Sequence, residues 1–300
     1  MKCRICKNIL GNSMLILKEK MFGIGESFEY FRCNACNCIQ ISEIPEDLSH
    51  YYPQNYYSFR PPQKRTIRKH VKIFRNALFS KILGGFYETT IFTDYGLSYA
   101  DRKKSILDIG SGNGVMLRNL SELGFKHLTG IDPFLSKEIR SKKFKLLKQE
   151  IQDITGEFDI VMSHHSLEHM QDPHKFFAVV SQRLKDGGRL ILRIPIFPNY
   201  IWDNFSVDWI QLDPPRHLYT FSIKGIEILC DMAGLSIKEI SYDGQPWSYA
   251  ATEYCQDGRT YEDFKANIKI ESHHITECDF ANQSKNGDSV CLTISKKLYA

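Results

Sequence analysis

The sequence has no long hydrophobic run and little excess charge. None of its apolar segments approaches the roughly 20 residues that a membrane-spanning helix needs. Cys3 and Cys6 stand near its start, where a secretion signal would have an apolar core. The formal net charge of +4 is too small to indicate nucleic-acid binding by itself. With no repeat and no low-complexity tract, these absences favour a soluble cytoplasmic protein without a transmembrane segment.

The length of 300 residues suggests two domains at about 150 residues per domain. Nine cysteines without a secretion signal favour reduced thiols or metal ligands over disulfides. We expect a small domain at residues 1–45, a linker at 46–97 and a larger domain at 98–300. Residues 245–288 exceed what a hairpin between two strands needs, so we expect an acceptor-side insertion or a partner surface there.

Four cysteines form a pair of Cys-x-x-Cys motifs, Cys3/Cys6 and Cys33/Cys36. Two such knuckles complete a tetrahedral metal site, and the spacing is typical of a zinc ribbon. The intervening residues 15–31 predict a small hairpin that turns at its glycines. We expect structural Zn²⁺ with all four cysteines as ligands, and Cys38 as a spare thiol that could replace the fourth. Four buried cysteines without metal are the alternative.

The linker combines tyrosines with a basic segment. Residues 51–59 contain four tyrosines, which suit either a lid over a ligand or a packed connection. Residues 60–83 carry eight Lys and Arg side chains and no acid, and their apolar residues have helical spacing. This predicts a basic amphipathic helix, docked on its own domain. A surface for phosphate-bearing substrates or an anionic membrane is the alternative.

A glycine-rich turn follows a short apolar run at 105–109. Residues 115–120 then continue with helical spacing. The glycines have the spacing Gly-x-Gly-x-Gly, which departs from the Gly-x-Gly-x-x-Gly of dinucleotide sites. Asp108 precedes the first glycine by two residues. An acid there can pair with a cation, which suits an amino-acid moiety better than a pyrophosphate.

Four further motifs follow the turn in order. Residues 127–133 predict a strand that ends in Asp132, whose carboxylate can accept from both hydroxyls of a ribose. Strands are also predicted at 144–147 and 158–163, and a turn with a fifth strand at 185–192. Together with Leu-Glu-His at 167–169, these motifs resemble class I S-adenosylmethionine-dependent methyltransferases of bacterial types 11, 12 and 23. The resemblance implies an α/β fold, a Rossmann-like doubly wound seven-stranded sheet, after the zinc ribbon.

The resemblance also implies the cofactor, S-adenosyl-L-methionine, and the residues that bind it. We expect binding by Asp108, Gly110, Gly112, Asn113, Gly114, Asp132, Pro133, Glu150, Ile151, Ser163 and His164.

Methylation of an oxygen acceptor calls for a base, and histidine suits that task at neutral pH. His217 and His165 are the candidate catalytic residues, although His217 could equally hold its own loop. Some relatives bind a divalent ion through Glu-x-x-Glu-His. The corresponding residues here are His165, Glu168, His169 and the later His217. A catalytic metal at these residues is an alternative, although His165 replaces the first Glu of the pattern.

We expect a methyltransferase (EC 2.1.1.-) with a small-molecule acceptor. By analogy with ribbon-bearing relatives, this is a sugar or nucleotide-sugar in polysaccharide biosynthesis. Aromatic residues at 195–215 suit the apolar face of a sugar or cover the sheet edge. A methyltransferase acting on RNA or protein, with the ribbon and basic helix as recognition arm, is the alternative, and a non-catalytic scaffold is the second. The acceptor atom and the oligomeric state stay open.

Overall fold

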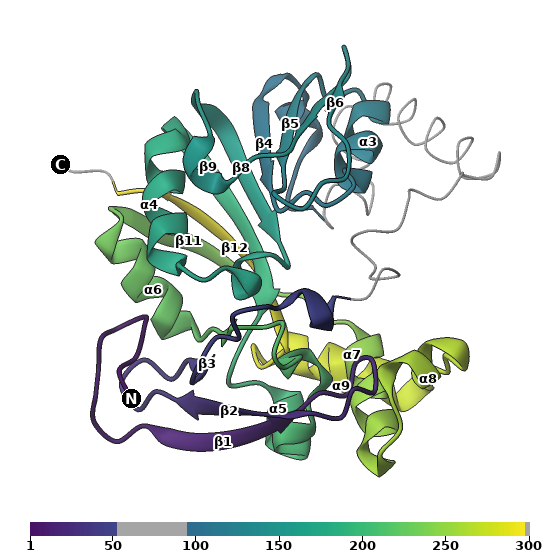
Figure 1. Cartoon of the computed structure of the whole chain (residues 1–300). Coiled ribbons are helices and arrows are strands. Elements are labelled where there is room, and N and C mark those ends of the chain that lie inside the picture. Colours follow the sequence, from purple (N-terminus) through teal and green to yellow (C-terminus); the bar gives the residue numbers. More distant parts are fainter. Residues whose placement is uncertain (53–94, 298–300) are drawn as a thin grey trace. The chain divides into compact units, whose positions relative to one another are not determined.

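The computed structural model describes residues 1–52 and 95–297 (Figure 1). The basic helix expected at 60–83 and most of the Tyr-rich segment lie outside these residues. The chain forms two compact units. The ribbon unit comprises Met1–Tyr52, His165–Phe177 and Arg193–Leu292. The glycine-turn unit comprises Pro53–His164, Ala178–Leu192 and Thr293–Ala300.

The larger sheet has the Rossmann-like arrangement of a mixed α/β fold. Its strand order is β11-β12-β9-β8-β4-β5-β7-β6. The eighth strand beyond the seven predicted is the two-residue β6, which pairs antiparallel with β7. In chain order the strands are β4 (Ser105–Ile109), β5 (His127–Ile131), β6 (Ile139–Arg140), β7 (Lys145–Leu147), β8 (Phe158–His164), β9 (Leu184–Pro195), β11 (Leu235–Tyr242) and β12 (Ser289–Lys296).

The central strands of the glycine-turn unit are parallel and buried. β4 pairs with β5 on one side and β8 on the other, and β5 also pairs with β7. Ile106 and Leu107 are fully buried in β4, as expected of a parallel strand covered on both faces. Because the carboxyl ends of these strands meet at one edge, the residues of this unit at the ends of β4, β5 and β8 gather there.

Seven α-helices of the described residues accompany the strands. Ser222 caps α6, because its side chain accepts from the backbone N–H of Gly225 at 2.9 Å. The helices are α3 (Val115–Glu122), α4 (Pro173–Arg183), α5 (Tyr200–Phe205), α6 (Ile223–Met232), α7 (Pro246–Tyr254), α8 (Tyr261–Ala266) and α9 (Ser272–Gln283). Within residues 1–52 and 95–297, no helix is both long and apolar enough to cross a membrane.

The ribbon unit contains a small antiparallel sheet with the order β1-β2-β3-β10. The predicted hairpin is confirmed: β1 (Ser13–Lys18) pairs with β2 (Ser27–Arg32), and the connection contains two glycines at positive φ. β3 (Ile39–Ile41) follows, and β10 (Tyr219–Thr220) pairs with it. The small sheet therefore includes a segment far beyond the predicted ribbon boundary at residue 45.

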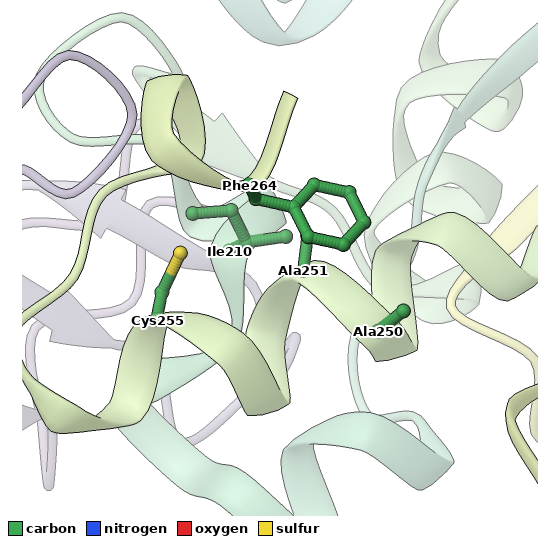
Figure 2. Close-up of a cluster of buried hydrophobic side chains, with 5 residues drawn as sticks. All are labelled: Ile210, Ala250, Ala251, Cys255 and Phe264. Atoms are coloured by element: carbon green, nitrogen blue, oxygen red, sulfur yellow. The ribbon is translucent and has the colours of Figure 1, made fainter. Parts of the chain in front are cut away.

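Residues 245–288 fold as helices that share a small apolar core with Ile210. Figure 2 shows the apolar side chains of this core converging between α7 and α8. Its buried members are Ile210, Ala250, Ala251, Cys255 and Phe264, and Met21 of the ribbon packs against them. The segment is thus a packed part of the ribbon unit; a role in acceptor or partner binding stays a prediction.

Candidate active site

The glycine turn between β4 and α3 is shaped by bonds to the end of β5. The N–H groups of Gly110 and Ser111 both donate to the carbonyl oxygen of Ile131 at 3.0 Å. Gly112 has a φ of 49° and donates to the Asp132 carboxylate at 3.0 Å. These N–H groups are therefore committed within the protein. Ligand recognition at this turn depends on the carboxylates rather than on the free amides of a phosphate loop.

Asp132 stands at the carboxyl end of β5, where it was expected. One carboxylate oxygen accepts from Gly112, and the other accepts from the N–H of Phe134 at 2.9 Å. The two bonds fix the carboxylate plane, and each oxygen has a further lone pair for a ligand hydroxyl. The geometry suits the ribose role that the sequence predicted.

Asp108 lies at the end of β4 with only 2% of its surface exposed. Burial, together with the charge of Asp132, raises the pKa of Asp108 to about 8. A buried acid beside a second carboxylate favours a cationic ligand, since a positive charge relieves both effects. The amino group and the sulfonium of S-adenosylmethionine are such charges, so the residues present fit this donor.

The remaining predicted cofactor residues also belong to the glycine-turn unit. Ser163, the next-to-last residue of β8, is fully buried, and its hydroxyl lacks a hydrogen-bond partner among the described residues. A bound ligand could supply one. His164 meets Tyr95 edge-to-face, with 6.2 Å between the ring centroids. Gly114, Asn113, Pro133 and Ile151 are buried or half-buried, and Glu150 is exposed.

Three predicted acceptor-side residues form a cluster within the ribbon unit. The cluster consists of Glu168, His169 and His217. Each offers one possible ligand atom, and these three atoms lie within 4.8 Å of one another. The rings of His169 and His217 are 4.7 Å apart. Glu168 is 1% exposed, and neither of its carboxylate oxygens has a hydrogen-bond partner in the described part of the chain. An unpartnered buried carboxylate is costly, so this cluster is built to receive a proton, a cation or a ligand.

Backbone carbonyls fix the orientation of both histidines. His217 Nδ1 lies 2.7 Å from the carbonyl oxygen of Gln211, and His169 Nδ1 lies 2.9 Å from that of Arg216. A carbonyl only accepts, so each Nδ1 carries the proton. With the proton on Nδ1, the neutral tautomer of His217 keeps the lone pair of Nε2 free. His217 Nε2 faces Glu168 at 4.0 Å and Asp213 at 3.9 Å.

Burial and neighbouring charges separate the protonation states in this cluster. Burial, reinforced by His169, lowers the pKa of His217 to about 4. Burial opposes ionisation of Glu168 too, but the three facing histidines outweigh it and lower the pKa of Glu168 to about 2. At neutral pH the cluster therefore holds a neutral imidazole beside a carboxylate.

His165 occupies a strained position before this cluster. Its φ of 49° is uncommon for a residue with a side chain, and its N–H donates to the Arg193 carbonyl at 2.8 Å. The ring is 40% exposed, with Nδ1 3.6 Å from Glu168. This distance is longer than that of a good hydrogen bond, so His165 is only a loose neighbour of Glu168.

A buried arginine, which the sequence analysis missed, supports the His217 turn. Arg216 is fully buried and donates to Asp213 through Nε at 3.0 and 3.1 Å. It also donates to Glu19 at 2.6 Å and to the Tyr51 carbonyl at 3.0 Å. The Asp-x-x-Arg-His spacing was visible in the sequence, but the partner Glu19 lies too far along the chain for any local pattern to indicate it.

The four predicted metal ligands converge in the ribbon unit. Cys3 and Cys36 sulfurs are 3.6 Å apart, and those of Cys6 and Cys33 are 3.5 Å apart. Tetrahedral zinc with bonds of about 2.3 Å places sulfurs about 3.8 Å apart, so the set fits the ion. A hydrogen bond with the Cys36 sulfur, together with burial, raises the pKa of Cys3 to about 12, so a cation is needed to hold the thiolates. Cys38 lies outside the cluster, against Ser222.

A second group of metal-ligand types, Glu253, His273 and His274, does not fit a metal. The backbone N–H of Glu271 donates to His274 Nδ1 at 3.0 Å, so the ring proton lies on Nε2. That proton points to Glu253 at 2.7 Å. A neutral imidazole cannot bind metal through a protonated nitrogen, so His274 caps α9 and ties it to α7.

The aromatic residues predicted at 195–215 are mostly structural. Phe197 and Trp209 are 1% exposed. The Tyr200 hydroxyl donates to Glu277, and Trp202 packs edge-to-face on Phe197 at 4.9 Å. This arrangement agrees with the alternative that the segment covers the sheet edge.

The methyltransferase domain family (Methyltransf_23) matches residues 90–240, which is half of the chain. The protein therefore belongs to this family of methyltransferase domains. The match contains the glycine turn, both donor-side acids and the His217 segment.

Two curated relatives carry the same printed name, ubiquinone biosynthesis O-methyltransferase. The protein of Aromatoleum aromaticum is 29% identical over 157 residues, covering 46% of this chain and 66% of the relative. That of Xanthomonas oryzae pv. oryzae is 33% identical over 99 residues, covering 29% and 41%. The chain thus spans less than two thirds of the length of these relatives.

Solved methyltransferase structures are also similar. The magnesium protoporphyrin IX methyltransferase of Synechocystis PCC 6803 with bound SAH has a TM-score of 0.46 at 12% identity, covering 83% of this chain and 97% of the other. The 1,6-didemethyltoxoflavin-N1-methyltransferase of Burkholderia thailandensis has a TM-score of 0.42 at 12% identity, covering 79% and 93%.

Proposed function

We propose that the protein transfers the methyl group of S-adenosylmethionine to a hydroxyl oxygen of a small molecule. The acceptor class we favour is a sugar or nucleotide-sugar. The observation that carries the oxygen assignment is the neutral His217, held by Gln211 with Nε2 free and facing the unpartnered Glu168.

In this proposal the donor supplies an activated methyl group on a sulfonium. Asp132 holds the ribose, and Asp108 pairs with the cationic end of the donor. Orientation of the reactants then provides much of the rate, since the methyl group needs no further activation.

His217 acts as the base on the acceptor side. Its Nε2 takes the proton of the acceptor hydroxyl while the O–CH₃ bond forms and the S–CH₃ bond breaks, and the electron pair of the broken bond stays on sulfur. The Gln211 carbonyl keeps the ring in the correct tautomer. The carboxylates of Glu168 and Asp213 stabilise the resulting imidazolium, a contribution that is large in a buried site.

A divalent ion is a second possibility for the same cluster, and the donor set fits one. Glu168 and the Nε2 atoms of His169 and His217 would bind it, and the carbonyls that hold both Nδ1–H groups are the supports that metal-bound histidines commonly have. The ion would supply a Lewis acid for the acceptor oxygen. Native mass spectrometry distinguishes a base from a metal site. One bound zinc per chain is accounted for by the four cysteines. A second ion that is lost in His217→Asn indicates a metal at Glu168, His169 and His217.

The choice of acceptor rests on two kinds of support. Ribbon-bearing methyltransferases that resemble this chain favour a sugar hydroxyl, whereas the printed name of the curated relatives favours a ring hydroxyl of the quinone type. The two differ in chemistry, because a phenol ionises near pH 10 and an alcohol much higher. Methylation of a sugar hydroxyl therefore depends more strongly on the base than methylation of a phenol does.

The test is a screen of nucleotide-sugars, free sugars and phenols with S-adenosylmethionine, followed by mass spectrometry for one added methyl. On the acceptor found, we expect His217→Asn to lower kcat by about 10²–10⁴-fold with unchanged donor affinity. His127→Asn, on an exposed histidine, is the matched control. Equal activity of His217→Asn and the control would contradict the role of His217.

Two other functions have distinct outcomes in the same screen. A methyltransferase for RNA would show acceptor binding that weakens steeply with salt. A scaffold without catalysis would bind the donor and methylate nothing.

A further inference from the structure

The four-cysteine sheet and the His217 segment share backbone hydrogen bonds. β10 pairs with β3 so that Tyr219 lies opposite Gln40, and the Ile41 N–H donates to the Leu218 carbonyl at 3.0 Å. β10 has two residues, and in the described chain β3 is its only strand partner. The position of β10 therefore depends on a strand that begins three residues after the metal ligand Cys36.

Both members of the His217–Glu168 pair are attached to this junction. The Tyr30 hydroxyl of β2 donates to the His217 carbonyl at 2.9 Å, with both residues buried. The Leu218 N–H donates to the Glu168 carbonyl at 2.8 Å. Thus the Leu218 carbonyl accepts from Ile41 of β3, and the Leu218 N–H donates to Glu168. Leu218 therefore fixes the position of Glu168 relative to β3.

Gln40 connects the junction to the metal ligands themselves. It is fully buried, and its Nε2 donates to Cys3 Sγ at 3.1 Å while its Oε1 accepts from the Arg4 N–H at 2.8 Å. Arg4 in turn donates through Nε to the Tyr219 hydroxyl at 3.0 Å. An N–H that points at a sulfur favours the thiolate, and such outer contacts orient metal ligands.

The second knuckle touches the same region of the fold. The Ser222 hydroxyl, which caps α6, donates to the Cys36 carbonyl. A Cβ on Gly225 would lie 2.2 Å from Cys38 Sγ, so α6 approaches the ribbon as closely as a glycine allows. Both knuckles therefore contact the segment that carries His217.

We propose that the four-cysteine centre positions the His217–Glu168 pair through Gln40 and β10, so that zinc occupancy controls the acceptor side and leaves donor binding unchanged. A ribbon this small has little core, and its metal supplies much of its folding energy. Without zinc, β3 loses its support, and β10 loses its pairing with β3. Asp108 and Asp132 belong to the glycine-turn unit, which contains none of the four cysteines.

The effect on methyl transfer rests on the proposed function. The positioning of His217 and Glu168 by zinc can be tested without it. All three tryptophans, Trp202, Trp209 and Trp247, lie in the ribbon unit, so their fluorescence reports on that unit alone. The imidazole NMR signals of His217, assigned with His217→Asn, report on the pair directly. Calorimetry with S-adenosylmethionine reports on the glycine-turn unit.

The experiment removes zinc from the full chain with a chelator and then restores it. We expect the His217 signals and the tryptophan emission to shift reversibly, methyl transfer to fall by more than about 100-fold, and the donor Kd to change by less than about twofold. Unchanged His217 signals, or donor binding lost together with them, would overturn the proposal. A chain whose His217 signals follow zinc, but which methylates no acceptor, would contradict the proposed function alone.

Gln40→Leu tests the connection in the zinc-bound chain. Loss of the N–H donor to Cys3 should weaken zinc about 10–100-fold. At saturating zinc, it should still shift the His217 signals and lower kcat, because the link from Cys3 to β10 is cut. Gln283→Leu, on the exposed end of α9, is the matched control. His217 signals in Gln40→Leu that match the control at saturating zinc would refute the role of Gln40.

Discussion

The two units of this protein are built in contrasting ways. In the glycine-turn unit, the donor-side residues come from one stretch, β4 to β8, and they lie at or shortly after the carboxyl ends of its strands. In the ribbon unit, His217 and Glu168 depend on Tyr30, Gln40 and Glu19, residues from the other end of the chain. The donor side is therefore a local construction and the acceptor side a long-range one. The two should respond differently to the same kind of damage.

The largest effect on the long-range side is expected from Arg216→Met. The change leaves Asp213 and Glu19 as buried carboxylates without their cation, which typically costs about 3–5 kcal/mol. Denaturant unfolding followed by tryptophan fluorescence measures this loss in the ribbon unit. Arg140→Met, on a side chain that is 65% exposed, is the control and should change stability by less than about 0.5 kcal/mol. Equal stability of the two variants would contradict the role of the Arg216 network.

On the local side, Asp132→Ala should have the strongest effect. It removes the acceptor for ribose hydroxyls and for the N–H groups of Gly112 and Phe134. A lost hydrogen bond to a charged group corresponds to roughly 10–100-fold in the donor Kd. Calorimetry measures the donor Kd. Asp153→Ala is the control, because Asp153 is an exposed acid in the turn that follows β7. The His217 signals should stay unchanged; if they shift as they do on zinc removal, the two sides are not independent.

A smaller effect is expected from Gly225→Ala. The added methyl meets Cys38 Sγ, and such overpacking costs about 1–3 kcal/mol. Zinc affinity should fall with it, because Cys38, two residues after the ligand Cys36, must move away from α6. Gly156→Ala is a useful comparison, since it has a positive φ but open space around its Cβ. A zinc affinity that is unchanged in Gly225→Ala would argue against contact between α6 and the knuckle.

The smallest effect is a pH dependence of donor binding. Burial raises the pKa of Asp108 to about 8, so near pH 7 most of the free protein carries a proton there. A cationic donor needs the ionised form, so its binding releases that proton and the affinity rises with pH. Between pH 7 and 8 the gain is roughly fivefold, and it levels off above pH 8. Asp108→Asn should abolish this dependence. A donor affinity that is flat from pH 6 to 8 would be inconsistent with a cation beside Asp108.

The contrast between the units also explains what the sequence could predict. Strand periodicity and the glycine spacing placed β4, β5, β8 and Asp132 correctly, because parallel strands bring their carboxyl ends together whatever the loops do. The four cysteines were predictable as a metal site because the spacing of two Cys-x-x-Cys motifs is itself typical of one. In contrast, β10 has only two residues, which is too short for an alternating pattern that would predict a strand. The Arg216–Glu19 pair and the Gln40–Cys3 bond join residues whose proximity arises only when the chain folds. His217 was chosen for its residue type, and the carbonyl that fixes its tautomer comes from the backbone of Gln211, which no side-chain pattern reveals.

The most direct test of this account is a calorimetric titration of S-adenosylmethionine into the zinc-loaded chain and two variants. We predict one site per chain, weakened roughly 10–100-fold by Asp132→Ala and unchanged by His217→Asn. Absence of binding, or equal weakening by both variants, would contradict a donor side that is built and maintained apart from the acceptor side.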